Sequence, residues 1–310
     1  MRWEVKALTQ QALSHVPRGE RVNYALQRRV LHTLPASDEA FRRKANRAFQ
    51  HFDAFVELGP RRPVAEAVFY EFGAGWDLAV QLVYWALGVE RQTVVDIRPI
   101  MRIELVNDTI TKLERLHGEW DRDLRLPGAA DLRGVEELRE RFGITYLAPR
   151  DARATGLPAG SLDFVSSTDT AEHIPGDDLR AILVECRRLL KPDGLLSYRA
   201  DLEDHYARGD GGASRYNFLR YSDRKWAVFN SPLHYQSRLR YPDYVRITRE
   251  AGFEIVREQV SRPSEHDLAA LRRLHVAERF RSYSVEELGV RGVTIVATRS
   301  NEAAPQSPTE

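Results

Sequence analysis

The sequence predicts an α/β protein built on a seven-stranded, mostly parallel, doubly wound sheet. Short apolar segments recur from residue 67 onward and alternate with segments that are apolar at helical spacing, which is the βαβ pattern of a parallel sheet. A glycine turn, Glu71-Phe72-Gly73-Ala74-Gly75, directly follows the first of these segments. The 310 residues are 43% hydrophobic, which is enough to bury a core of the size that such a sheet needs.

Residues 1–64 are expected to form an N-terminal helical cap. From Ser37 onward, apolar side chains recur every three or four residues, at Phe41, Ala45, Phe49, Phe52 and Val56. Ser37 is suited to cap the start of this helix, and Gly59-Pro60 is suited to end it.

Seven strands are predicted after the cap, over residues 67–72, 93–97, 144–147, 162–168, 195–200, 253–260 and 292–298. Helices are predicted between them over residues 76–87, about 100–116, 177–191 and about 265–280. The charge-rich segment 119–141 is expected to be an inserted helix or loop, and Lys191-Pro192-Asp193-Gly194 a turn. Residues 300–310 are short of apolar side chains, so we expect a disordered tail there.

Composition argues against several function classes. Lys and Arg (46) nearly balance Asp and Glu (45), so the net charge of +1 gives no general attraction to nucleic acid or an anionic membrane. The single cysteine, Cys186, excludes an internal disulfide framework and a cysteine-rich metal site, and it favours the reducing cytoplasm. The longest apolar stretch, around Val68 to Gly88, is interrupted by Glu71 and Asp77, so we expect no membrane span.

The glycine turn is suited to a nucleotide-like ligand. Gly73 and Gly75 allow positive φ angles and a close approach of the backbone to a ligand. Trp76 stands where a pyrophosphate-binding loop continues toward a third glycine, which argues against a dinucleotide. Asp96 lies 21 positions after Gly75, a spacing that lets a carboxylate accept hydrogen bonds from both hydroxyls of a ribose. A tight turn and a capping or surface carboxylate are the alternatives for these residues.

A set of segments, in this order, resembles the class I S-adenosylmethionine-dependent methyltransferases over residues 65–200, with a looser likeness to residue 298. The segments are Glu71 to Gly75, Asp96, Asp151-Ala152 with Leu157-Pro158, Leu162 to Thr168, Ala171-Glu172-His173-Ile174-Pro175, and Leu189 to Leu196. Asp193 stands where the family more often has glycine, and Trp76 departs from the commoner glycine-rich ending of the first motif. The resemblance implies a methyltransferase domain over residues 65–299 with an antiparallel last strand.

The resemblance also implies S-adenosylmethionine as the cofactor. Glu71 is expected to accept a hydrogen bond from the cofactor ammonium, directly or through water, and Asp96 to hold the ribose. Asp151 is expected to accept from the adenine amine, with the Ala152 N–H facing a ring nitrogen; an ion pair of Asp151 with Arg150 or Arg153 is the alternative. The full set of expected cofactor contacts is Glu71, Gly73, Ala74, Gly75, Asp96, Ile97, Asp151, Ala152 and Thr168.

Methyl transfer from a sulfonium is an in-line displacement, so no metal is expected to be required. A hydroxyl nucleophile generally also needs a base. His205 is the first candidate, because a histidine beside Asp204 in a flexible loop can titrate near neutrality. His173, which follows Glu172, is expected to orient its loop. The alternative for His205 is a structural role, in which it caps a helix or binds a backbone carbonyl.

Residues 205–246 are expected to form a lid over the acceptor. The chain carries eight of its 29 aromatic side chains between Tyr216 and Tyr244, and basic residues outnumber acidic ones there. Such a segment can stack on a sugar or aromatic acceptor and pair with an anionic group. A packing subdomain is the alternative. Interleaved basic and aromatic residues also suit single-stranded nucleic acid, which the balanced net charge argues against.

The sequence therefore predicts transfer of a methyl group from S-adenosylmethionine to a small or medium-sized acceptor, at a hydroxyl of a sugar-like or natural-product-like molecule. Carbon and nitrogen acceptors remain open. One alternative is a binding or scaffold protein that keeps the fold without catalysis, and another is a dinucleotide-dependent oxidoreductase, which the missing third glycine argues against. An acceptor pocket beside an intact cofactor set would favour turnover, whereas a filled pocket would favour binding alone.

Overall fold

The computed structural model describes residues 2–15, 19–29, 33–208, 210 and 212–300, so residues 301–310 of the expected tail lie outside it. In this part of the chain, seven strands form one sheet: β1 (Val68–Phe72), β2 (Arg91–Val95), β3 (Ile144–Leu147), β4 (Leu162–Thr168), β5 (Leu190–Asp201), β6 (Phe253–Ser261) and β7 (Gly292–Arg299). Their order is β3-β2-β1-β4-β5-β7-β6, and β7 is antiparallel to both neighbours. The predicted fold class is confirmed.

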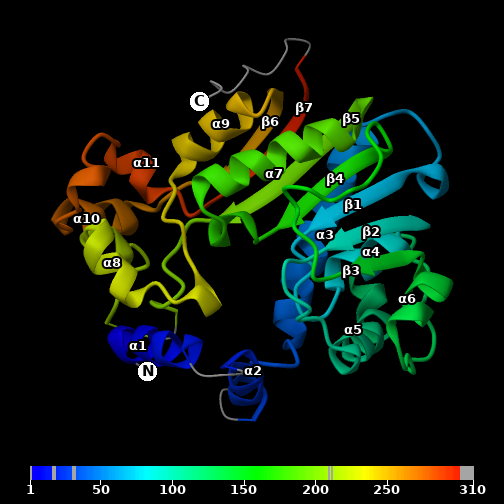
Figure 1. The fold of residues 1–310 in the computed structure, drawn as a ribbon, viewed down its shortest axis with the longest axis horizontal. Coiled ribbons are helices and arrows are strands. Elements are labelled where there is room, and N and C mark those ends of the chain that lie inside the picture. Colours follow the sequence, from blue (N-terminus) through cyan, green and yellow to red (C-terminus); the bar gives the residue numbers. More distant parts are fainter. Residues whose placement is uncertain (1, 16–18, 30–32, 209, 211, 301–310) are drawn as a thin grey trace.

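Helices cover both faces of the sheet (Figure 1). Side chains of α3, α4, α5 and α6 form a core with one face, and those of α7 and α9 form a core with the other. The described α-helices are α1 (Trp3–Ser14), α2 (Gly19–Arg29), α3 (Asp38–Leu58), α4 (Ala79–Ala86), α5 (Ile103–Leu116), α6 (Val135–Phe142), α7 (Gly176–Leu189), α8 (Asp223–Phe229), α9 (Tyr241–Glu250), α10 (Glu265–Arg273) and α11 (Val285–Gly289).

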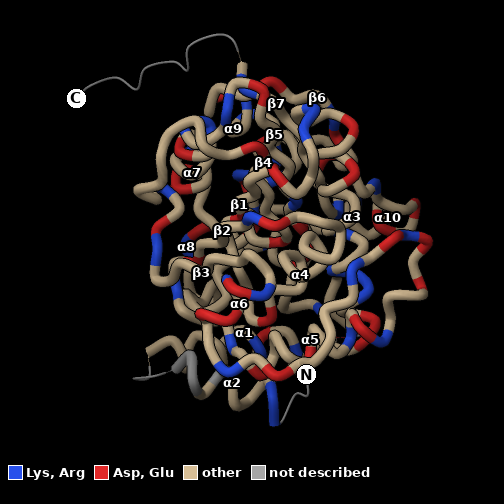
Figure 2. The backbone as a smooth tube through the Cα atoms, turned by 90° about the vertical axis from the view of Figure 1, so that its right-hand side faces the viewer, with Lys and Arg blue, Asp and Glu red and all other residues tan. Residues whose placement is uncertain are grey.

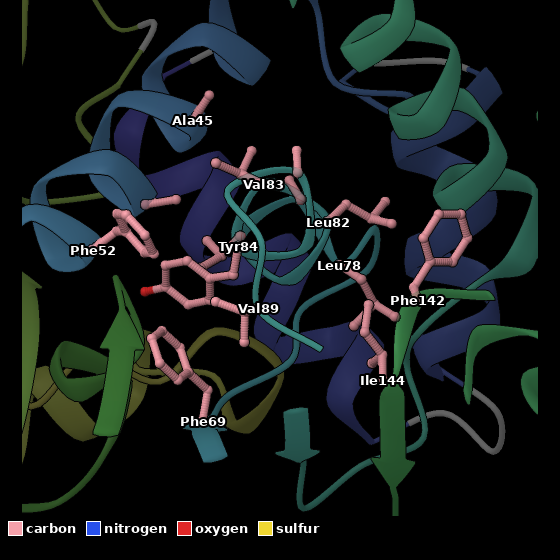
Figure 3. Packing of buried hydrophobic residues seen from close by; sticks show 14 of the residues in the cluster. Ala45, Phe52, Phe69, Leu78, Leu82, Val83, Tyr84, Val89, Phe142 and Ile144 are labelled. Carbon is pink, nitrogen blue, oxygen red and sulfur yellow. The ribbon is translucent and has the colours of Figure 1, made fainter. Parts of the chain in front are cut away.

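The two sheet faces are filled by alternating side chains of the central strands. Phe69 of β1 packs beside Tyr84 of α4, with ring centroids 5.3 Å apart, and beside Phe55 of α3 at 4.8 Å. Figure 3 shows Phe69, Tyr84 and Phe52 gathered in this cluster. The next residue, Tyr70, points into the opposite core. Burial of both faces is what a parallel sheet requires, and it holds the strand ends in fixed positions.

The ends of two helices differ from the prediction. Ser37 caps α3 as expected, because its hydroxyl accepts a hydrogen bond from the Ala40 N–H. The helix after the glycine turn begins later than predicted, at Ala79 instead of Trp76, since Leu78 adopts a positive φ of 49°. Residues 73–78 are therefore a loop of their own. The helix predicted over 265–280 ends at Arg273.

The segment Lys191–Gly194 is not the separate turn that its composition predicts. It lies inside β5, whose pairing with β4 is irregular between Leu162 and Phe164, so the extra residues bulge out of the strand. The Lys191 ammonium lies 2.9 Å from both carboxylate oxygens of Asp163, which is fully buried in β4. This ion pair keeps the bulge attached to the sheet.

A third buried cluster lies away from the sheet and joins α1 to the segment after β5. Trp3 is 1% exposed and stacks on Tyr221, with ring centroids 5.3 Å apart. Figure 1 shows α1 next to α8. The buried members are Trp3, Ala7, Tyr206, Ala207, Tyr216, Phe218, Leu219, Trp226, Leu271, Phe280 and Leu288. Thus α1 packs with the predicted lid while α3 packs on the sheet, and a domain boundary at residue 64 stays a prediction.

Acidic and basic residues are interspersed over the fold, as the balanced composition implies (Figure 2). Among the described helices, none has both the length and the apolar character needed to cross a membrane.

Candidate active site

The glycine turn forms a loop at the carboxyl end of β1. Gly73 has a φ of +89° and Gly75 a φ of +67°, conformations that L side chains rarely adopt. The Gly73 N–H donates a hydrogen bond to the Val95 carbonyl oxygen at 2.9 Å, which fixes the loop against the end of β2. A Cβ on Gly73 would overlap the side chain of Thr170. The loop thus lies where the strand order reverses between β1 and β4, the place where ligands bind in such sheets.

Asp96 lies beside this loop, directly after β2. Its Oδ1 accepts a hydrogen bond from the Arg98 N–H at 3.0 Å, and the backbone N–H groups of Gly75 and Ala74 also face the carboxylate. Burial raises the pKa of Asp96, and these hydrogen bonds act in the opposite sense. Backbone groups of the loop therefore hold the carboxylate in place, and Asp96 lines the neighbouring cavity.

The glycine loop, Asp96 and the segment after β5 line a single cavity of 740 Å³. Small-molecule sites commonly occupy roughly 300–1,000 Å³. The predicted site residues on its wall are Gly73, Gly75, Asp96, Ile97, Asp151, Ala152, His173 and His205. The predicted residues off its wall are Glu71, Ala74, Thr168 and Asp204.

Glu71 is buried within β1, behind the loop. The Ser166 hydroxyl of β4 donates a hydrogen bond to Glu71 Oε2 at 3.1 Å. Burial raises the pKa of Glu71 to about 8, against the effect of the hydrogen bonds that it accepts. The side chain therefore links β1 to β4 beneath the loop, and its expected contact with the cofactor ammonium stays a prediction.

Asp151 lines the cavity but is also paired with Arg153. The Arg153 Nη2 lies 2.7 Å from Asp151 Oδ2, and the Arg153 N–H donates to Oδ1 at 2.8 Å. This guanidinium lowers the pKa of Asp151. An exposed ion pair of this kind stabilises a protein by only about 0–1 kcal/mol, so an adenine amine can compete with Arg153 for an oxygen of the Asp151 carboxylate.

Three imidazoles come together on the wall of this cavity. His173 follows β4, His205 follows β5, and His234 ends a short 3-10 turn (Pro232–His234); their ring centroids are 5.1, 5.2 and 5.4 Å apart. Burial lowers the pKa of each of the three side chains. Burial therefore favours the neutral form of all three imidazoles, in which each has one nitrogen lone pair. The lowered pKa of His205 disfavours the titration near neutrality that the sequence suggests.

Asp204 does not pair with His205. Its carboxylate turns away from the cavity and accepts a hydrogen bond from the Trp3 indole N–H at 2.6 Å and another from the Tyr206 N–H at 2.9 Å. The carboxylate nearest to His205 is that of Asp201, with 3.9 Å between Oδ1 and Nε2. The Asp204 side chain thus joins α1 to the loop after β5, and the expected acid–histidine pair is absent because two neighbouring residues of this turn face opposite ways.

Replacing Trp3 by Phe is expected to lower the free energy of unfolding by ~1–3 kcal/mol, because it leaves the buried Asp204 carboxylate without its indole donor. Urea titration measures this loss. Trp120→Phe is the matched control, since the Trp120 indole donates to Asn46 at 3.0 Å in an exposed position and should cost less. Equal losses in the two variants would contradict the role given to Asp204.

Most of the aromatic, basic segment after β5 packs internally. Of its eight aromatic side chains, only Tyr235 lines the cavity in the described structure. Arg240 is fully buried and donates to the carbonyl oxygens of Leu202, Leu288 and Val290. The packing alternative therefore describes most of this segment, and a stacking surface of many aromatic rings is not formed. The part that lines the cavity is Pro232 to Tyr235.

Two further parts of the site have little or no signal in the sequence. Trp76 lines the cavity and stacks on Tyr24 of α2, with ring centroids 5.3 Å apart, and the Arg102 guanidinium lies 5.7 Å from the Trp76 ring. This stack places α2 over the glycine loop. His234 is the second site residue that the sequence did not indicate. No motif surrounds it, and the fold alone brings it next to His173 and His205.

The strand order, the left-handed glycine loop and the acid after β2 define the class I methyltransferase fold. Residues 131–198 match a family described as a methyltransferase domain. The expected resemblance is confirmed: the chain carries a methyltransferase domain of the class I S-adenosylmethionine-dependent fold, for which S-adenosylmethionine is the cofactor.

Solved structures with similar folds have low sequence identity. A putative sarcosine dimethylglycine methyltransferase from Galdieria sulphuraria is 16% identical, with 85% of this chain and 88% of that one covered and a TM-score of 0.46. Geranyl diphosphate C-methyltransferase from Streptomyces coelicolor is 13% identical, with 93% and 87% covered and a TM-score of 0.47. No curated protein matches the sequence. These similarities identify no acceptor.

Proposed function

We propose that this protein transfers a methyl group from S-adenosylmethionine to a small or medium-sized acceptor, at a hydroxyl group of a sugar-like or natural-product-like molecule. The observation that carries the proposal is the single cavity whose wall includes both the cofactor loop and the three histidines. A donor bound at the loop and an acceptor bound at the imidazoles would share one enclosed space, which an in-line displacement requires.

Three features support cofactor binding beside the glycine loop. The Asp96 carboxylate is oriented by backbone N–H groups, as a ribose-binding acid needs to be. Ile97, the next residue, is 62% exposed although it is apolar, and it lines the cavity. An adenine ring lying on Ile97 would remove this apolar surface from water. Asp151, paired with Arg153, offers its oxygens beside the same surface.

The position of His205 on the cavity wall supports a hydroxyl group as the nucleophile. His205 is 6% exposed, lines the cavity, and its Nε2 makes no hydrogen bond of ordinary geometry within the described structure. A neutral imidazole with a free lone pair can accept the proton that an acceptor hydroxyl must lose. The displacement itself needs no metal: the oxygen bonds to the methyl carbon while the carbon–sulfur bond breaks, and the sulfonium leaves as a neutral thioether.

The open cavity also supports turnover over binding alone. In a scaffold protein that has lost catalysis, side chains would be expected to fill the space beside the cofactor loop. Here 740 Å³ remains, and it reaches from Gly75 to Tyr235. Incubation with S-adenosylmethionine carrying a labelled methyl group and a panel of hydroxyl, amine and activated-carbon acceptors tests the proposal. Release of the demethylated cofactor with label in a hydroxyl product is the expected result, and label only in amine products would contradict it.

Asp96→Ala is expected to weaken binding of S-adenosylmethionine by ~1–3 kcal/mol, because the ribose loses a charged hydrogen-bond acceptor. Calorimetric titration measures the change. Asp193→Ala serves as the control, since the Asp193 side chain is exposed and pairs with Arg62 away from the cavity. If Asp96→Ala binds the cofactor as tightly as the wild type does, the ribose lies elsewhere.

A further inference from the structure

The acceptor end of the cavity contains a set of side chains with unused ligand atoms. Glu172 and His173 lie on the turn after β4 (Ala171–His173), and His205 lies on the loop after β5. Because β4 and β5 are adjacent and parallel, these two loops leave the sheet side by side. One nitrogen or oxygen from each of the three residues lies within 4.8 Å of the others.

The carboxylate of this set has no ion-pair partner among the described residues. Glu172 is 5% exposed, and neither of its oxygens makes a hydrogen bond of ordinary geometry to the described residues. The nearby Asp201 is paired with Arg208, whereas no described Lys or Arg lies within ion-pair distance of Glu172, although the charge of Arg199 acts on its carboxylate from farther away. Burial, together with the charge of Asp201, raises the pKa of Glu172 to about 8. A buried carboxylate of this kind is stabilised either by taking up a proton or by binding a cation, and two imidazoles beside it supply further ligands for a cation.

The two imidazoles are prepared as ligands in different ways. His173 Nδ1 lies 2.6 Å from the Tyr235 carbonyl oxygen, so this nitrogen carries the proton and Nε2 keeps its lone pair. A histidine whose other N–H is held by a backbone carbonyl is the usual arrangement around bound metals. His205 Nε2 is buried and makes no hydrogen bond within the described structure.

We infer that Glu172, His173 and His205 bind one divalent transition-metal ion, with Zn²⁺ or Fe²⁺ as the fitting class. Two imidazoles and one carboxylate suit these ions, whereas Mg²⁺ and Ca²⁺ prefer oxygen ligands alone. A tetrahedral zinc site places its ligand atoms roughly 3.4 Å apart, so ligand atoms that now lie up to 4.8 Å apart need to approach one another by at most about 1.4 Å. His234, whose ring lies 5.2 Å from that of His173, flanks the site.

Three protein ligands leave coordination positions open toward the cavity, which His173 and His205 line. The consequence for the acceptor rests on the proposed function. An acceptor hydroxyl bound to the metal would lose its proton to bulk water more readily, and the resulting oxygen would attack the methyl carbon. Acceptors that chelate through a hydroxyl and a neighbouring carbonyl or hydroxyl oxygen are the class that this site would select. His205 would then act as a ligand and not as the proton acceptor.

Metal binding to the full chain, expressed without a histidine tag and stripped with a chelator, tests the site directly. Zn²⁺ and Co²⁺ are titrated separately, with bound metal counted by mass spectrometry and the Co²⁺ coordination followed by its visible absorption. The expected result is one equivalent per chain, in a nitrogen–oxygen site of low coordination number, that a large excess of Mg²⁺ does not displace. The absence of a stoichiometric site in the wild type would overturn the inference.

The variants Glu172→Gln and His205→Ala are expected to weaken Co²⁺ binding by more than tenfold, since loss of an outer partner alone costs roughly 10–100-fold. His275→Ala is the matched control, because His275 is exposed and outside the cavity. Unchanged Co²⁺ affinity in both ligand variants would also overturn the inference and would leave water as the partner of Glu172. Metal binding is measured without cofactor or acceptor, so its failure is distinct from a failure of methyl transfer.

Discussion

Gly73→Ala is expected to cost about 2–5 kcal/mol in total, as the sum of the loss in the free energy of unfolding and the loss in the free energy of cofactor binding. An L residue at a φ of +89° costs about 1–2 kcal/mol, and the overlap of the new methyl group with Thr170 adds about 1–3 kcal/mol. The loop can relieve the overlap only by moving away from the segment after β4, which moves it relative to the cavity that it lines. Urea unfolding and calorimetric titration with S-adenosylmethionine together measure the loss.

Gly160→Ala separates the two causes. Gly160 also has a positive φ, of 59°, but a Cβ there would meet no atom within 4 Å, and the residue lies outside the cavity. This control is expected to lose only the backbone contribution of about 1–2 kcal/mol, with cofactor affinity unchanged. If Gly73→Ala resembled Gly160→Ala in both measurements, the close approach of Gly73 to Thr170 would have no role in the site.

His205→Ala is expected to slow methyl transfer by about 10²–10⁴-fold while cofactor affinity stays nearly intact. A positioned proton acceptor contributes that much to a rate, and loss of a ligand to a metal that activates the acceptor hydroxyl would also slow the reaction. His205 lies on the cavity wall beside His173 and makes no hydrogen bond or ring contact with the glycine loop in the described structure, so a loss confined to kcat is the expected signature. Single-turnover rates and calorimetric titration measure the two quantities separately.

Three outcomes of the His205→Ala experiment are informative. Turnover at the wild-type rate would show that His205 is structural. A slow variant that has also lost bound metal would assign the effect to metal binding, whereas a slow variant with the metal content of the wild type would assign it to proton transfer. His275→Ala should match the wild type in both rate and affinity.

Most of the strands were predictable because they are short runs rich in apolar or β-branched residues. β3 and β4 have the predicted boundaries. The start of β5 was not predictable, since Lys-Pro-Asp-Gly has the composition of a turn and is held in the strand by long-range ion pairs, of Lys191 with buried Asp163 and of Asp193 with Arg62. The late start of α4 had no signal either, because leucine is among the residues least expected at a positive φ.

The cofactor end of the site was more predictable than the acceptor end. Gly73, Gly75 and Asp96 are tied to strand ends, so strand prediction alone brings them together. The acceptor end depends on long-range contacts: Asp204 turns toward Trp3, some 200 residues away in sequence, and His234 approaches His173 only through the fold. The aromatic enrichment after β5 was misleading because aromatic rings fill a core as readily as they bind a ligand, and here α1 supplies the surface that they cover.

The most direct test of the central claim is calorimetric titration of the wild-type protein with S-adenosylmethionine and with its demethylated product. The account predicts one site per chain for both ligands, with binding weakened in Asp96→Ala and unchanged in Asp193→Ala. The absence of measurable binding of either ligand at millimolar concentration would contradict the assignment of the cavity between the glycine loop and Asp96 as a methyltransferase cofactor site.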